Sequence, residues 1–158
     1  MIPRRTALAA ALALLCAPAA QGADLIAAAD PDGVVAAMQR LGYRAMLDVD
    51  NVGDPMIRSA SSRIEFEVLF YDCDDGRACR ALQFSAGFDL EDAVPMELLN
   101  QWNASHRFGA AFRDEEGDPF LQYDVTTLGG LTEENFADIV DWWRVALSGF
   151  AEHVDYRP

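Results

Sequence analysis

The amino-acid sequence predicts an α+β fold, in which helices pack on one face of an antiparallel five-stranded sheet. Two patterns carry this prediction. Apolar and polar residues alternate over several short segments, as in half-buried strands, and elsewhere apolar residues recur every three or four positions, as in amphipathic helices. The predicted order is helix, three strands, helix, two strands, helix (α-β-β-β-α-β-β-α). Because strands and helices do not alternate along the chain, a parallel doubly wound sheet is disfavoured.

The first helix is predicted to begin after Asp30, which can cap its free N–H groups, with Pro31 at the first helical position. Gly42 is expected to end this helix. Its apolar face consists of Val34, Val35, Met38 and Leu41. A strand is then predicted over 43–50, and a short second strand of weaker signal over 56–60.

A β-hairpin is the clearest element of the sequence. Its two strands have apolar residues at alternate positions, namely Ile64, Phe66, Val68 and Phe70, and then Leu82, Phe84, Ala86 and Phe88. An antiparallel pairing in which the residue numbers sum to 152 sets every one of these residues opposite another. The apolar pattern therefore selects one register for the hairpin.

The same register places Cys73 opposite Cys79, across a loop formed by residues 74–78. Residues opposed in this way have Cα atoms about 5.5–6 Å apart, which suits a disulfide. A redox-active pair is the alternative, but such cysteines are usually separated by two residues rather than five. We therefore predict a structural disulfide between Cys73 and Cys79.

The second half of the chain predicts two helices and two strands. The second helix starts at Pro95, and strands at 108–112 and 121–125 flank an acidic turn. Thr132 caps the last helix, whose first turn holds two glutamates at its positive end. The apolar stripe of this helix consists of Phe136, Ile139, Val140, Trp143, Leu147, Phe150 and Val154.

Length and charge exclude several classes of function. The chain has 158 residues, with 26 acidic residues, 12 arginines, no lysine, and a net charge of −14. A hydrophobic share of 51% argues against disorder, in spite of this charge. Nucleic-acid partners are excluded because phosphate binding needs clustered basic residues, and anionic membrane surfaces are disfavoured for the same reason.

Residues 1–23 are predicted to be an export signal. Arg4 and Arg5 supply a positive start, 7–20 is apolar, and small residues precede the first acid, Asp24. An uncleaved membrane anchor is the alternative, but the apolar stretch is shorter than the roughly 20 residues of a spanning helix. The paired arginines lack the rest of a twin-arginine motif.

Cleavage is expected after Gly22 or Ala23, with Ala19 as an alternative, and leaves a single domain over 24–158. A lipoprotein anchor at Cys16 is disfavoured by the large residue before it. Cleavage removes two arginines and no acid, so the net charge changes from −14 to −16. An even number of cysteines remains, as expected of a disulfide-bonded protein. The predicted location is periplasmic or secreted, without stable membrane insertion.

A family resemblance appears in the second half of the chain. The run Leu99-Asn100-Gln101-Trp102-Asn103 followed by Arg107-Phe108 resembles the centre of the YbjN domain family. The downstream residues with the same resemblance are Gly117, Gly130-Leu131-Thr132, Asn135-Phe136, Trp143 and Phe150. The family is described as bacterial sensory transduction regulators, with a fold similar to type III secretion chaperones, which often dimerise and hold polypeptides. The resemblance implies a non-enzymatic role and brings no catalytic residues.

Two acidic loops are the candidates for metal chemistry. Asp72, Asp74 and Asp75 surround the hairpin loop, and 114–118 forms a second acidic turn. Carboxylates can bind Ca²⁺, but the closing Glu of the twelve-residue calcium-binding loop is missing. Turn-forming aspartates explain both loops more simply. We therefore predict no metal site and no cofactor.

Other titratable residues also favour structural interpretations. His106 and His153 lie in no metal-spaced cluster and near no nucleophile motif. Glu65 and Glu67 could form a carboxylate pair, but they alternate with core residues and fit a solvated sheet face.

Four residues are candidates for a partner-contact surface: Asn100, Trp102, Asn103 and Trp142. The alternative for the first three is a core tryptophan flanked by helix-ending asparagines. Trp142 lies beside the apolar stripe of the last helix, next to Trp143. Two adjacent tryptophans cannot both face one core, so one is expected at an edge or an interface.

The sequence thus predicts an exported, non-enzymatic module that binds proteins in a chaperone-like or regulatory role. Its partner is a protein of unknown identity, and it is expected to act as a homodimer. The acidic surface selects basic partners in a salt-dependent way. The alternative is a metal-dependent or carboxylate hydrolase, which requires Asp72, Asp74, Asp75 and Asp118 to converge. A structural envelope protein without a specific ligand is a third interpretation.

Overall fold

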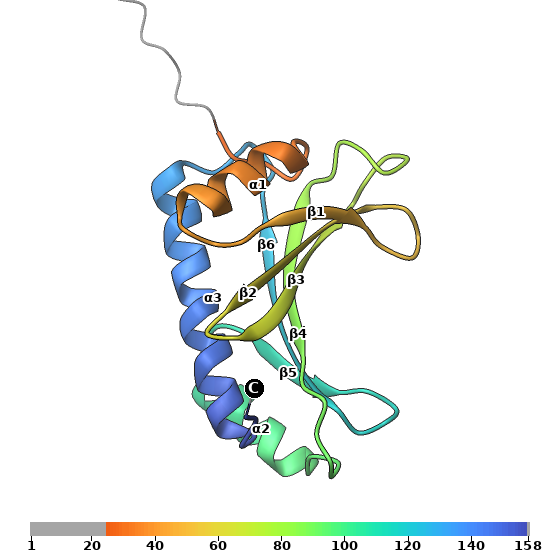
Figure 1. Ribbon diagram of the computed structural model, residues 1–158, viewed down its shortest axis with the longest axis vertical. Coiled ribbons are helices and arrows are strands. Elements are labelled where there is room, and N and C mark those ends of the chain that lie inside the picture. The colour runs from red at the N-terminus through yellow and green to blue at the C-terminus, as the bar shows by residue number, and fades with distance from the viewer. Residues whose placement is uncertain (1–24, 158) are drawn as a thin grey trace, which may run out of the picture.

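A computed structural model describes residues 25–157, which form three helices and one six-stranded antiparallel sheet (Figure 1). The spatial order of the strands is β1-β2-β3-β4-β6-β5. Helices α1 and α3 lie on one side of the twisted sheet, and α2 lies beside the end of α3 (Figure 1). The elements are α1 (Pro31–Arg40), β1 (Met46–Val49), β2 (Pro55–Ser61), β3 (Ile64–Tyr71), β4 (Ala81–Gly87), α2 (Met96–Ser105), β5 (Ala110–Arg113), β6 (Pro119–Thr126) and α3 (Glu133–His153).

The sheet has six strands rather than the predicted five. The predicted order gives three strands before the second helix, whereas the segments predicted at 43–50 and 56–60 and in the hairpin are four, and all four are strands in the structure. The weak segment at 56–60 lies in a full strand, β2, which pairs with β1 and β3. Its alternation is weak because the adjacent Met56 and Ile57 are both buried, on opposite faces of the sheet. A two-residue turn at Ser62 and Arg63 joins it to β3 with φ angles of 51° and 69°. Such turns usually contain Asn or Gly, so the sequence carries no turn signal here.

The predicted register of the β3–β4 hairpin is confirmed. Val68 pairs with Phe84 and Phe70 pairs with Leu82, so the residue numbers sum to 152. All four of these side chains are buried. A slip of one residue would have turned the whole apolar set toward the opposite face.

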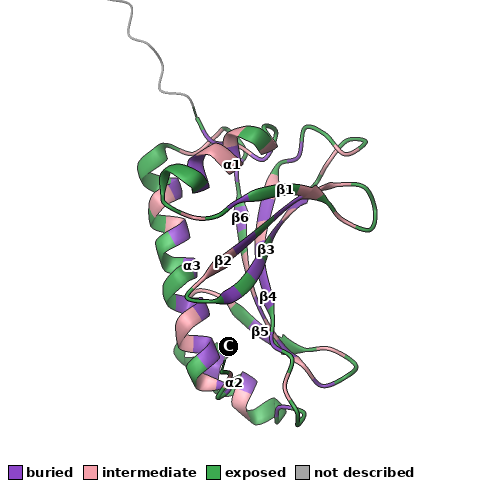
Figure 2. Ribbon diagram, in the orientation of Figure 1, coloured by how far each residue is buried: buried purple, intermediate pink, exposed green. Residues whose placement is uncertain are grey.

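The core lies between the sheet and α3, where Figure 2 shows the buried residues on the side of the helix that faces the strands. Trp143 is fully buried there, and its ring lies 5.6 Å from Phe66 and 5.7 Å from Phe84 between centroids. Thr132 caps the helix, because its side chain accepts a hydrogen bond from Asn135 N at 3.2 Å. The remaining buried residues of α3 are Phe136, Val140, Ala146, Leu147, Phe150 and Ala151.

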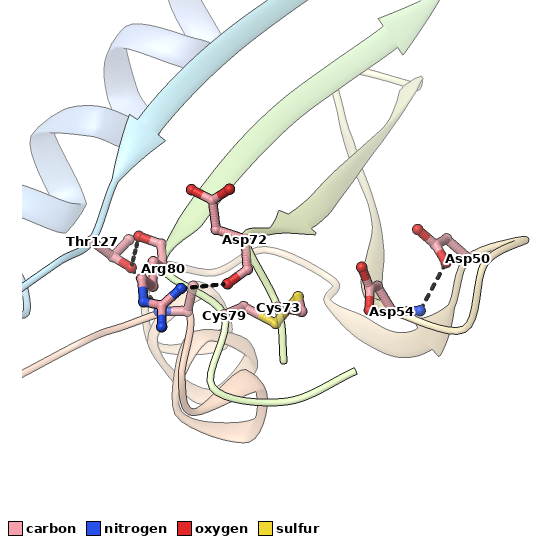
Figure 3. Close-up of a disulfide and its surroundings, with 8 residues drawn as sticks. Asp50, Asp54, Asp72, Cys73, Cys79, Arg80 and Thr127 are labelled. Atoms are coloured by element: carbon pink, nitrogen blue, oxygen red, sulfur yellow. Dashed lines mark hydrogen bonds between the residues drawn. A yellow bond between two sulfur atoms is a disulfide. The ribbon is translucent and has the colours of Figure 1, made fainter. Parts of the chain in front are cut away.

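The structure contains the predicted disulfide between Cys73 and Cys79 (Figure 3). Its two Cα atoms are 3.9 Å apart, closer than the expected distance of about 5.5–6 Å. The cysteines lie beyond Tyr71 and Ala81, the last paired residues of the hairpin. Asp74 and Arg77 close this loop with reciprocal backbone hydrogen bonds of 2.7 and 3.1 Å.

Within residues 25–157, no helix combines the length and apolarity needed to cross a membrane. The predicted signal at 1–23, including Cys16, lies outside the described residues.

Candidate functional site

The four candidate contact residues divide between core and surface. Trp102 is buried, with 1% of its surface exposed, whereas Trp142 is 38% exposed. Asn100 is exposed on α2, and Asn103 is exposed but hydrogen-bonded. The adjacent tryptophans of α3 thus point to different surroundings, because Trp143 is fully buried.

Trp102 is a core residue, so its assignment to an exposed contact surface has to be corrected. Its indole Nε1 donates to Gly109 O at 3.1 Å, and its ring packs edge-on against Phe150 with centroids 5.1 Å apart. The His106 ring stacks on the Trp102 ring, with the two centroids 3.6 Å apart. Trp102 therefore anchors the end of α2 to α3.

Asn103 attaches α2 to the edge of the sheet. Its Nδ2 donates to Ala111 O at 2.9 Å, and its Oδ1 accepts from Ala111 N at 2.7 Å. The side-chain amide therefore acts as a strand neighbour for β5, whose outer backbone groups would otherwise be unpaired. This role is structural.

Trp142 belongs to a chain of aromatic contacts that the sequence did not predict. Its ring centroid lies 4.8 Å from that of Phe108, which lies 5.6 Å from Tyr123 on β6. The guanidinium carbon of Arg107 lies 5.8 Å from the Phe108 ring centroid, a cation–π contact. The loop after α2 thus packs onto the outer side of α3 through Phe108.

An apolar groove of about 290 Å³ lies between this loop and α3, and we call it the α2–α3 groove. Trp102 and Trp142 both line it, although they come from different helices. Gly149 borders the Trp102 ring in this groove, where a Cβ would lie at ordinary van der Waals distance, 3.5 Å from the ring. The other lining residues are Ser105, His106, Arg107, Phe108, Val145 and Ala146.

Acidic residues flank the exposed apolar side chains of α3. Asp138 lies one turn before Trp142, and Glu152 lies after the groove, both exposed. The pKa of Tyr123 is raised by burial and, to a smaller extent, by the negative charge of Asp138. Asp141 is paired with Arg144 at 2.8 Å. Trp142 and Val145 are therefore an apolar patch within an acidic surface.

The two acidic loops do not form one site. The loop holding Asp72, Asp74 and Asp75 joins β3 to β4, whereas Asp118 lies in the β5–β6 turn at the opposite end of the sheet (Figure 1). Asp118 Oδ1 accepts from Leu90 N at 3.3 Å, a structural role. Within residues 25–157, no group of three His, Cys, Asp or Glu side chains lies close enough to share a metal ion. The hydrolase interpretation thus lacks the convergence it requires.

Both histidines take part in packing. His106 stacks on Trp102, and His153 Nε2 lies 2.9 Å from Leu98 O, where it joins the end of α3 to α2. Glu65 and Glu67 are exposed on the sheet face that no helix covers.

That helix-free face carries a cavity of about 470 Å³. Arg44, Arg58, Glu65 and Glu67 line it together with Phe120. Arg58 is already paired with Asp48 at 3.1 Å. Because its lining mixes opposite charges over an open sheet, we favour the smaller aromatic groove as the contact site.

Sequence comparison assigns the family. No curated protein matches the chain. The profile of the YbjN family, described as "putative bacterial sensory transduction regulator", matches residues 30–155. This match spans α1 to the end of α3 and includes every residue of the α2–α3 groove. The chain belongs to the YbjN family.

Proposed function

We propose that this YbjN protein is an exported, non-enzymatic regulatory or chaperone-like module that binds a partner polypeptide in the α2–α3 groove. The observation that carries the proposal is the exposed Trp142 ring, 38% accessible and supported from behind by Phe108. Tryptophans held in this way are enriched among the residues that dominate binding energy at protein interfaces.

The size of the groove favours a polypeptide side chain over a small-molecule ligand. Its volume of about 290 Å³ lies at the lower limit of small-molecule sites, which usually measure about 300–1,000 Å³. One or two apolar side chains of a partner would fill it against the exposed Trp142 and Val145. The rest of the contact would then form on the surrounding surface of α3.

Charge defines the partner further. Asp138 and Glu152 flank the apolar patch, and the exported chain carries a net charge near −16 after loss of two arginines from −14. A segment with basic residues on either side of an apolar anchor complements this surface. Because these charges are exposed, high salt should weaken the complex.

Export is supported by the amino-terminal pattern of 1–23 and by the disulfide between Cys73 and Cys79. Disulfides persist in oxidising compartments such as the bacterial periplasm. We further propose that the protein acts there as a homodimer.

The experiment is affinity capture from periplasmic extract with the wild-type protein and with Trp142→Ala, at low and high salt. Proteins bound by the wild type should be lost from the variant and reduced at high salt. Leu128→Ala is the matched control, because Leu128 is exposed outside the groove. Equal capture by Trp142→Ala and the wild type would contradict the assignment of the groove.

A further inference from the structure

Strand β1 forms one edge of the sheet and exposes apolar side chains there. Met46, Leu47 and Val49 are exposed, so only one of its four residues, Asp48, is polar. Edge strands in soluble proteins are commonly protected by charge, proline or a covering element. The opposite edge, β5, is covered by Asn103 of α2.

The backbone of β1 has hydrogen-bonding groups directed away from the sheet. Asp50 N donates to Asp54 O at 2.9 Å, so even-numbered residues direct their backbone groups toward β2. Ala45, Leu47 and Val49 therefore direct theirs outward.

Side chains satisfy part of this outward edge. Gln39 Nε2 donates to Ala45 O at 3.1 Å, and Asp48 Oδ1 accepts from Val49 N at 2.9 Å. Within residues 25–157, no side chain or loop bonds the outward N–H and C=O of Leu47. Leu47 is thus the centre of an unpaired edge.

We propose that β1 is the dimer interface, where a second copy of the chain pairs antiparallel with it and makes one continuous sheet. The twofold axis passes beside Leu47, whose N–H and C=O bond those of the partner's Leu47. The inference rests on the homodimer in the proposed function and names its surface.

Most side chains match in this register. Ala45 lies opposite the partner's Val49, Leu47 lies opposite its own copy, and Arg44 lies opposite the partner's Asp50. Met46 lies opposite the partner's Asp48, whose charge is already paired with Arg58. A register centred on Asp48 would set two aspartates against each other and would misalign the outward backbone groups. A twofold interface needs such self-complementarity.

The first test is sedimentation equilibrium of the purified protein, which should be a dimer at micromolar concentration. Leu47→Glu places like charges at the twofold axis, and we expect the dimer Kd to rise about tenfold or more. Because Leu47 is 45% exposed, the fold should be retained, which circular dichroism checks. Val52→Glu is the control, because Val52 is 78% exposed outside the paired residues.

The second test is a symmetric cross-link. Opposed residues in a hydrogen-bonded antiparallel pair have Cα atoms about 5.5 Å apart, a distance that a disulfide spans. Leu47→Cys should therefore oxidise to a covalent dimer, and Val52→Cys should remain monomeric on a non-reducing gel.

A monomeric wild type at about 100 µM, well above the micromolar range expected here, would overturn the proposal. An unchanged dimer in Leu47→Glu, or no cross-link in Leu47→Cys, would also overturn it. These results are separable from the function of the groove, because Trp142→Ala should lose partner capture and keep its dimer.

Discussion

At the scale of single residues, two buried polar atoms have no hydrogen-bond partner among the described residues: Ser59 Oγ and Trp143 Nε1. Such an atom is destabilising, because it has lost its hydrogen bonds to water without gaining replacements. For Trp143, the packing of its large ring against Phe66 and Phe84 offsets the cost of the unpaired N–H. Ser59 has no such compensation, because its side chain is small.

Ser59→Ala should therefore stabilise the protein. We expect the free energy of unfolding to rise by about 1 kcal/mol, because the substitution removes an unpaired buried hydroxyl and creates little cavity. Urea denaturation of both proteins measures the change. Ser85→Ala is the control, because Ser85 is equally buried but accepts from Gln122 Nε2 at 3.4 Å, and should not stabilise. A loss of stability in Ser59→Ala would contradict the assignment.

Tyr123 should make stability depend on pH in the alkaline range. Burial raises its folded-state pKa above the unfolded value, so its contribution is fully present below about pH 10 and is lost as the pH rises through the folded pKa. In Tyr123→Phe, the free energy of unfolding should fall less steeply between about pH 9 and 11. Denaturant titrations across that range provide the measurement, and parallel pH profiles would argue against this role.

At the scale of elements, the regular patterns could be predicted and the irregular ones could not. The stripe of α3 and the β3–β4 register follow from periodic burial, which the sequence displays directly. Strand β2 gives only a weak signal in the sequence, because Met56 and Ile57 are buried on opposite faces and its turn at Ser62 and Arg63 lacks Gly and Asn. Phe108 and Val145 both line the α2–α3 groove. No local sequence pattern predicts that two segments so far apart along the chain lie together.

The attachment of α2 to the sheet depends on one side chain. Asn103→Ala should lower the free energy of unfolding by about 2 kcal/mol, because it removes two hydrogen bonds and leaves the Ala111 backbone groups unpaired. Asn100→Ala, on the exposed side of the same helix, should change it by less than about 0.5 kcal/mol. Thermal or urea unfolding compares the two variants. Equal effects would show that the Asn103 bonds contribute no stability.

At the scale of the whole molecule, charge and aromatic residues are arranged on different surfaces. Charged side chains of both signs, among them Arg58 and Glu67, lie on the helix-free sheet face, whereas apolar side chains are exposed at the α2–α3 groove and at β1. In the two proposals above, the α2–α3 groove binds a different protein and β1 pairs with another copy of the chain. A dimer of the proposed kind would present two grooves.

If the protein is exported, the mass of the native chain should be lower by the mass of the removed signal. We expect a chain that begins at Ala23 or Asp24, because the predicted signal would be cleaved after Gly22 or Ala23. Intact-mass spectrometry of the periplasmic fraction measures this, and it should also show two hydrogens missing at Cys73 and Cys79. An uncleaved chain beginning at Met1 in the cytoplasm would rule out export.

The central claim is that the α2–α3 groove binds a partner protein, and site-specific photo-cross-linking in living cells tests it most directly. A photoreactive amino acid at Val145, which lines the groove, should give a discrete adduct with a different protein. The adduct should disappear when Trp142→Ala is added. The same probe at Leu128, exposed outside the groove, should give none. No adduct at Val145, or the same adducts from both positions, would contradict the account.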